Sequence, residues 1–169
     1  MKPTSQQVIE ALPHVRYEVV SLLLTPAHDS SNEALVESVY FRKMAHGRVL
    51  YTFFSTPPSK RDSDDVVSDD YGFKAEELYG VDRAELLKRF NKDLFHLTYT
   101  RLERTHDTKC WPMDSLLPPI ARQSRRFIDH VLQNNAIAVS EPERELWRAL
   151  KLADVKGLRL QQNTSNVAT

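Results

Sequence analysis

The chain has 169 residues, with 23 basic and 23 acidic side chains, four glycines and one cysteine. This length predicts one domain, able to bury roughly 70% of its unfolded surface without a disulfide or a metal. A single cysteine excludes an internal disulfide and a cysteine-based zinc site. Zero net charge argues against a generally basic nucleic-acid binder, and the absence of GxGxxG and GxxxxGK[ST] patterns argues against a glycine-rich phosphate loop.

Apolar residues recur with helical spacing along most of the chain. Pro13 is expected to end the first helix, and Ser30 or Ser31 to cap the long third one. Ser140 with Glu143 fits a capping box that opens the last helix. The expected helices are Thr4–Leu12, His14–Leu24, a segment from Ser30 or Ser31 to Phe54, Asp82–Arg104, Leu117–Leu132 and Ser140–Ala153. The predicted fold is an all-α single bundle of five or six helices.

A long acidic segment, residues 57–81, separates the two central helices of this prediction. Residues 57–82 carry eight acidic and three basic side chains, whereas residues 83–130 carry ten basic and six acidic ones. A connection of this length within a compact domain is often functional or mobile, and Lys74–Leu78 is expected to form a helical turn. The charge asymmetry leaves room for a local anion site that the acidic segment covers.

The predicted organisation is one helical domain over residues 1–155, followed by a tail, residues 156–169, expected to be disordered. Pro118 and Pro119 are expected in the first turn of their helix, where proline is tolerated. No stretch approaches 18 apolar residues, so we expect neither a signal peptide nor a membrane span, and a cytoplasmic location.

Polar residues break the apolar stripe of the third helix. On a helical wheel Arg42 and His46 fall in one sector, one turn apart. The same sector holds Leu35, Val39, Val49, Leu50 and Phe53. A charged group on an apolar face needs a partner or a cavity, so these two residues are candidate binding residues.

The helix from Asp82 shows a similar break. Its apolar stripe is shared or flanked by Asn91, Thr98 and Arg101. If the two faces meet, these residues form a buried network with Arg42 and His46. The carboxylates expected to neutralise its arginines are those of Asp64, Asp65 or Glu37. Such a network either fixes only helix register or binds a ligand, and the sequence leaves both open.

Arg89 and His96 lie seven residues apart on the opposite face of that helix, with Lys92 between them. One interpretation is a solvated charged face. The other is a polar surface completed by a second subunit, where an imidazole exchanges protons and a guanidinium holds phosphate. A basic cluster, Arg122, Arg125 and Arg126, is better explained as a solvated face. No metal site and no cofactor are predicted.

Two stretches resemble a known group of proteins. Arg89–Arg101, RFNKDLFHLTYTR, and Met44–Phe54, MAHGRVLYTFF, are similar to sequences of small bacterial helical proteins. The spacing of Arg89 and His96 resembles the R-x4-6-H motif of HEPN domains. That resemblance implies a metal-independent ribonuclease acting as a homodimer, or a relative that binds nucleotides or proteins. It implies that Arg89 positions phosphate and that His96 transfers a proton.

The sequence therefore predicts an RNA- or nucleotide-handling protein with HEPN-like character, with RNA, a nucleotide or a protein as partner. Two alternatives belong to other classes. One is a non-enzymatic interaction module that the network of Arg42, His46, Asn91 and Arg101 stabilises. The other is a small-molecule sensor whose ligand lies among those residues.

Overall fold

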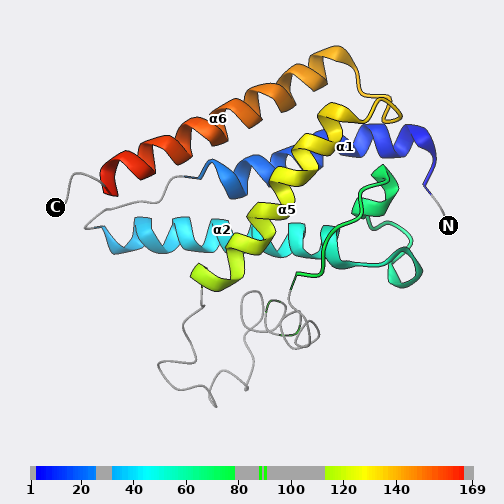
Figure 1. Cartoon of the computed structure of the whole chain (residues 1–169). Helices are drawn as coiled ribbons and strands as arrows, with labels where there is room; N and C mark the ends of the chain where they lie inside the picture. The colour runs from blue at the N-terminus through cyan, green and yellow to red at the C-terminus, as the bar shows by residue number, and fades with distance from the viewer. Residues whose placement is uncertain (1–2, 26–31, 79–87, 89, 91–112, 166–169) are drawn as a thin grey trace.

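The computed structural model describes residues 3–25, 32–78, 88, 90 and 113–165. Within these ranges it contains four α-helices, two short 3-10 turns and no strand (Figure 1). The elements are α1 (Ser5–Leu23), α2 (Glu33–Ser55), η1 (Pro58–Lys60), η2 (Ser68–Tyr71), α5 (Met113–Gln133) and α6 (Glu141–Ser165). The predicted all-α class is confirmed for this part of the chain, whereas HEPN-like character stays a prediction.

α1 is one continuous helix, so the prediction of two helices divided at Pro13 is wrong. Thr4 caps it, because its hydroxyl accepts a hydrogen bond from the Gln7 N–H. An interior proline costs about 3 kcal/mol. Burial of one apolar side chain contributes about 1.5–3 kcal/mol, and four on one face of α1 outweigh that cost: Leu12, Val15, Val19 and Leu22.

α2 begins one or two residues later than predicted. Asn32, not Ser30 or Ser31, is the cap, and its side-chain oxygen accepts a hydrogen bond from the Leu35 N–H at 3.3 Å. The helix ends at Ser55, as the prolines that follow predict. Its buried positions all lie in the second half: Met44, Gly47, Leu50, Tyr51, Phe53 and Phe54.

The segment after α2 has a defined path over residues 57–78. Its second 3-10 turn, η2, ends at Gly72, whose positive φ of 67° suits a residue without a Cβ. The helical turn expected at Lys74–Leu78 is absent, and the turn at Ser68–Tyr71 takes its place. Tyr71 and Phe73 are buried in the core, so packing of aromatic side chains rather than helix propensity decides this path.

α5 begins at Met113, earlier than predicted, so Pro118 and Pro119 lie in its second turn and not its first. In α6 the Ser140 hydroxyl accepts a hydrogen bond from the Glu143 N–H, as the capping box predicts. The Glu143 carboxylate instead binds Arg16 of α1 at 2.7 and 3.1 Å. α6 continues to Ser165, so its predicted end near Ala153 is wrong. It also crosses residue 155, and the division into domain and tail stays a prediction.

The described residues contain four α-helices, where five or six were predicted for the whole chain. The predicted first two are one helix, and the helix predicted at Asp82–Arg104 lies outside the described residues, apart from Lys88 and the buried Phe90. Among the helices that the structure describes, none combines the length and apolar character needed to cross a membrane.

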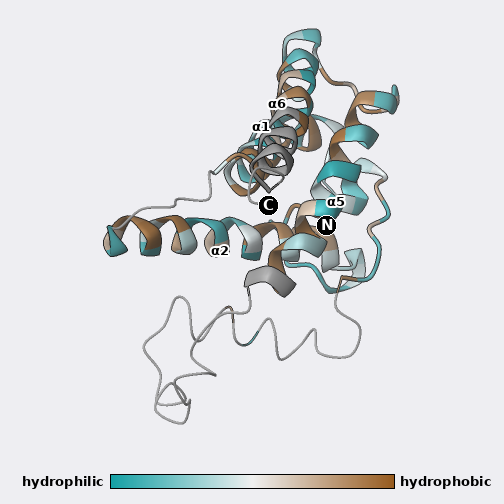
Figure 2. Cartoon of the chain, turned by 60° about the vertical axis from the view of Figure 1, so that its left-hand side comes forward, coloured by the Kyte–Doolittle hydropathy of each residue, from teal (hydrophilic) through white to brown (hydrophobic). Residues whose placement is uncertain are grey.

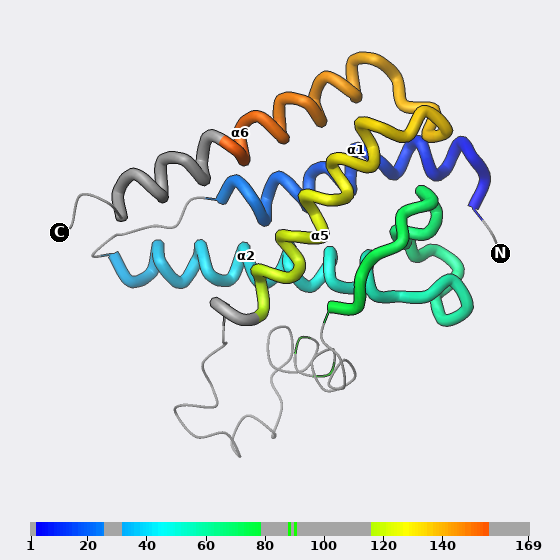
Figure 3. The backbone as a smooth tube through the Cα atoms, viewed as in Figure 1, coloured from blue at the N-terminus to red at the C-terminus, as the bar shows by residue number. Residues whose placement is uncertain are grey.

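α1 lies between α6 and α2, and α5 crosses them (Figure 1). Figure 2 shows the same stacking from a second direction, with α1 and α6 together on one side of α2. The tube in Figure 3 shows residues 57–78 folding back beside the first half of α1. The Tyr71 hydroxyl fixes this return by donating a hydrogen bond to the Val8 carbonyl at 3.1 Å.

Aromatic side chains fill the core around Phe127 of α5, which is fully buried. Its ring lies 5.2 Å from Phe53, 5.3 Å from Phe73 and 5.5 Å from Tyr71, all in edge-on geometry. Trp147 of α6 completes the cluster at 5.9 Å. We call these five residues the aromatic core. It joins α2, α5, α6 and the 57–78 segment.

Candidate functional site

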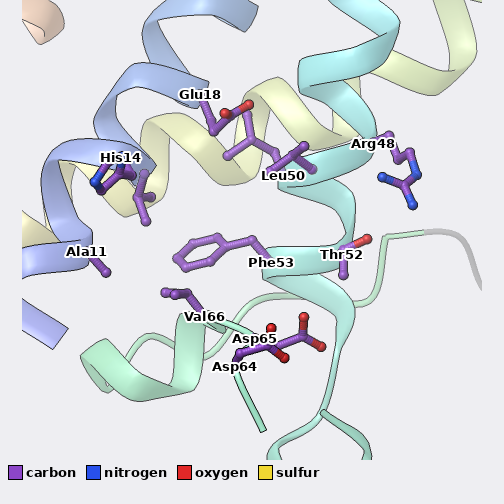
Figure 4. Close-up of a pocket in the computed structure, with 12 residues that line it drawn as sticks. Ala11, His14, Glu18, Arg48, Leu50, Thr52, Phe53, Asp64, Asp65 and Val66 are labelled. Atoms are coloured by element: carbon purple, nitrogen blue, oxygen red, sulfur yellow. The ribbon is translucent and has the colours of Figure 1, made fainter. Parts of the chain in front are cut away.

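A cavity of about 450 Å³ lies where α1, α2 and residues 64–66 meet (Figure 4). Small-molecule sites in proteins typically measure about 300–1,000 Å³. Three elements separated in sequence form its wall, so only the folded chain creates it. It is lined by Ala11, His14, Val15, Glu18, Arg48, Val49, Leu50, Thr52, Phe53, Asp64, Asp65 and Val66.

α1 contributes one helical face to the cavity. Ala11, His14, Val15 and Glu18 follow the spacing of residues that share a face. The face is apolar at Ala11 and Val15 and polar at His14 and Glu18. Because α1 passes through Pro13 without a break, all four line the same wall.

α2 contributes the buried floor. Leu50 and Phe53 are buried, and Phe53 belongs also to the aromatic core. Thr52 and Arg48, also on α2, are the polar residues that this helix contributes to the lining. Figure 4 shows the ring of Phe53 turned into the cavity, with the Arg48 guanidinium on the other side of the α2 ribbon.

The third wall is the acidic segment. The Asp65 carboxylate accepts a hydrogen bond from the Asp62 N–H at 3.1 Å. Arg61 and Asp70 form an ion pair of 2.5 Å whose side chains are only 8% and 10% exposed. The same Asp70 carboxylate accepts a hydrogen bond from the Val67 N–H. These contacts close the segment upon itself, so Asp64 and Asp65 stand in fixed places at the cavity.

A smaller cavity of about 140 Å³ lies beside the first. Gln7 and Val8 of α1 line it, together with Pro3, which precedes the helix. The two cavities share Ala11 and the stretch Asp64–Val66 as lining. The 64–66 stretch therefore forms a wall common to both.

His46 has a carboxylate partner on α1. Its Nδ1 lies 2.7 Å from the Glu18 Oε2, with side chains 15% and 21% exposed. The Tyr17 ring packs edge-on against the imidazole at 5.5 Å. Arg42 is exposed and donates a hydrogen bond to the Ser21 hydroxyl at 3.3 Å. Both contacts join α2 to α1.

The carboxylates of Asp64, Asp65 and Glu37 were predicted to neutralise the arginines of the network, and Arg42 instead contacts the Ser21 hydroxyl. The wheel placed Leu35 and Val49 on the apolar face, yet they are 39% and 42% exposed. The buried face of α2 is centred on Met44, Gly47 and Leu50 instead. This rotation puts Arg42 and His46 at the edge facing α1, where Glu18 is within reach.

Most of the other predicted site residues lie outside the described residues. This holds for the predicted catalytic pair, Arg89 and His96, and for the binding residues Asn91, Lys92, Thr98 and Arg101. Their roles and their contact with Arg42 and His46 stay predictions.

The basic cluster on α5 is largely neutralised. Arg125 binds the buried Asp154 of α6 through two hydrogen bonds of 2.7 and 2.9 Å. Arg126 lies 3.0 Å from the Glu76 carboxylate and over the Phe73 ring. These contacts give two of the three arginines a role in holding elements together.

Sequence reasoning missed Glu18, His14, Arg48 and Thr52. A signal for two of them was present, because His14 and Glu18 are four residues apart on one predicted helix. The assumed end at Pro13 separated them from Ala11, and nothing in the sequence brings residues 64–66 to that face.

Chemically, the site combines an apolar floor with ionisable groups at its edge, which suits binding of a small organic molecule. Within the part of the chain that the structure describes, no group of three or more His, Cys, Asp or Glu residues is arranged to hold a metal ion. Comparison of the chain with known protein families, with curated proteins and with solved structures found no match.

Proposed function

We propose that this chain is a helical binding module for a small organic molecule, with a sensing or regulatory role. The observation that supports the proposal is the 450 Å³ cavity formed by α1, α2 and residues 64–66. Its floor is tied to the aromatic core through Phe53, and its acidic wall is held by Arg61 and Asp70. A ligand bound there contacts both the floor, which is joined to the aromatic core, and the acidic wall. Its binding therefore stabilises the native state.

A variant that fills the cavity tests the proposal. Ala11→Trp places an indole in the cavity, and Leu152→Trp on the exposed face of α6 is the matched control. Thermal unfolding is followed against a panel of amines, carboxylates, nucleotides and RNA. A binder at 100 times its Kd stabilises the native state by about 2.7 kcal/mol. We expect such a shift with the wild type and Leu152→Trp and its loss with Ala11→Trp.

Two results would reject the proposal. One is a panel in which no compound shifts the wild type. The other is a compound that stabilises Ala11→Trp as much as the wild type, because the cavity would then not be its site. A shift produced by RNA alone would favour the ribonuclease prediction.

The RNA-handling prediction has its own test, since Arg89 and His96 lie outside the described residues. Purified protein is incubated with RNA in EDTA, which removes divalent metals. Metal-independent cleavage that disappears in His96→Ala would support the prediction. Equal background cleavage by both proteins would remove it.

A further inference from the structure

We propose that the ligand of the cavity is a linear aliphatic diamine or polyamine, bound with an ammonium group at each end. The inference rests on the proposed function, since it concerns the same cavity. It adds the chemical class of the ligand, which follows from where the charges and the apolar surface lie.

Carboxylates stand at two places on the cavity wall and come from separate elements. Glu18 belongs to α1, whereas Asp64 and Asp65 belong to the acidic segment. Figure 4 shows Glu18 on one side of the Phe53 ring and the two aspartates on the other. A ligand with one positive charge can pair with the carboxylate at only one of these places, whereas a ligand with a positive charge at each end can pair with carboxylates at both.

Each place retains acceptor capacity. His46 contacts only Oε2 of Glu18, and within the described residues no hydrogen bond to Oε1 occurs. Asp65 has one oxygen bonded to the Asp62 N–H, and the Asp64 carboxylate has no hydrogen bond or ion pair among the described residues. A carboxylate offers about four lone-pair sites and accepts from ammonium readily.

The surface between the two places is apolar. Val15, Leu50, Phe53 and Val66 line it, and Leu50 and Phe53 are buried. Transfer of methylene groups from water to such a surface is favourable. A sugar or a phosphate would instead lose hydrogen bonds to water there. An unbranched methylene chain with an amine at each end matches an apolar surface that has carboxylates at each end.

The positive groups at the site do not block this assignment. The Arg48 guanidinium lies across the α2 ribbon from Phe53 in Figure 4. An alkylamine keeps its positive charge at pH 8, because the ordinary pKa of an alkylammonium group lies well above 8. Binding is therefore best measured at pH 8, with three carboxylates and one guanidinium on the lining.

Isothermal titration calorimetry of the whole chain with four five-carbon probes tests the class. The probes are 1,5-diaminopentane, pentylamine, pentan-1-ol and pentanoate. We expect the diamine to bind at least tenfold tighter than pentylamine, pentylamine tighter than the alcohol, and no binding of pentanoate. Glu18→Gln should lower the affinity for the diamine to nearly that for pentylamine. The double variant Asp64→Asn with Asp65→Asn should have the same effect, because it removes the carboxylates at the other end of the cavity.

Glu37→Gln is the matched control, since it removes one exposed acidic charge from α2 outside the cavity. We expect its diamine affinity to stay within twofold of the wild type. Glutamine at 18 can still accept a hydrogen bond from His46, and the thermal midpoint of each variant shows whether it is folded.

The outcomes separate this inference from the proposed function. Equal affinities for diamine, amine and alcohol, or unchanged diamine binding in the Asp64/Asp65 variant, would overturn the diamine assignment. If pentanoate or a nucleotide binds and Ala11→Trp abolishes it, the binding module stands and the diamine fails. Diamine binding that Ala11→Trp leaves intact would overturn both.

Discussion

The aromatic core and the cavity share Phe53 yet differ in how their surroundings are held. The core packs Phe127 of α5 among rings from α2, α6 and the 57–78 segment. The cavity has only two helices and a turn-rich segment around it, and that segment is held by an ion pair and backbone hydrogen bonds. Side-chain packing fills the aromatic core, whereas the polar contacts around the cavity leave it open.

The largest expected effect comes from removing the centre of the core. Phe127→Ala should lower the free energy of unfolding by about 4 kcal/mol, because it leaves a void among rings that cannot all collapse. Urea unfolding measures this. Leu152→Ala, on the exposed side of α6, is the control and should change stability by less than about 0.5 kcal/mol. A loss near 1 kcal/mol for Phe127→Ala would mean that the core is not centred on this ring.

A smaller loss is expected where the acidic segment is held. Asp70→Asn removes the charge that pairs with the Arg61 side chain, which is only 8% exposed, and should cost about 3 kcal/mol. Asp69→Asn, the exposed neighbour, is the matched control. Urea unfolding compares the two. If both variants unfold alike, the Arg61–Asp70 pair does not hold the cavity wall.

The conformation of Gly72 predicts a loss of about 1–2 kcal/mol in Gly72→Ala, because φ is positive there. No atom lies within 4 Å of an added Cβ, so the cost is conformational and not steric. Asparagine tolerates this region better than alanine, and Gly72→Asn should therefore lose less. Thermal unfolding ranks the two variants, and the reverse order would contradict the left-handed conformation.

The smallest effect at neutral pH is expected for Tyr71→Phe, which loses one hydrogen bond worth about 1 kcal/mol. Burial raises the pKa of the Tyr71 phenol, and the Asp70 carboxylate raises it further. The native protein therefore keeps a proton that the unfolded chain releases above about pH 10, and stability falls as pH rises. Between about pH 9 and about pH 11 the wild type should lose stability more steeply than Tyr71→Phe. Parallel pH profiles of unfolding would contradict this.

Local signals predicted much of the fold correctly. The apolar spacing of α2 and the prolines after it predicted its end at Ser55 within one residue. Ser140 predicted the start of α6. Pro13 misled the prediction, because its local cost is smaller than the burial of the stripe it interrupts. Propensity could not reveal that, since the stripe gains its energy only against α2, α5 and α6.

The candidate site could be predicted less well. The wheel identified His46 as a polar residue in need of a partner, which is confirmed by Glu18. It gave no partner for His46 and the wrong buried face, because the face centred on Met44, Gly47 and Leu50 lies about one residue, roughly 100°, around α2 from the predicted one. The cavity was not predictable, since it requires residues 64–66 to return to α1.

Composition, spacing and caps by themselves determined the all-α class of the described residues and the acidic segment that follows α2. These properties depend on backbone geometry and on neighbours within one helical turn. Only the tertiary structure decided that Glu18 meets His46, that Tyr71 binds the Val8 carbonyl, and that an open cavity remains beside a packed core. Contacts between distant segments depend on how whole helix faces pack together, and no local sequence pattern specifies that packing.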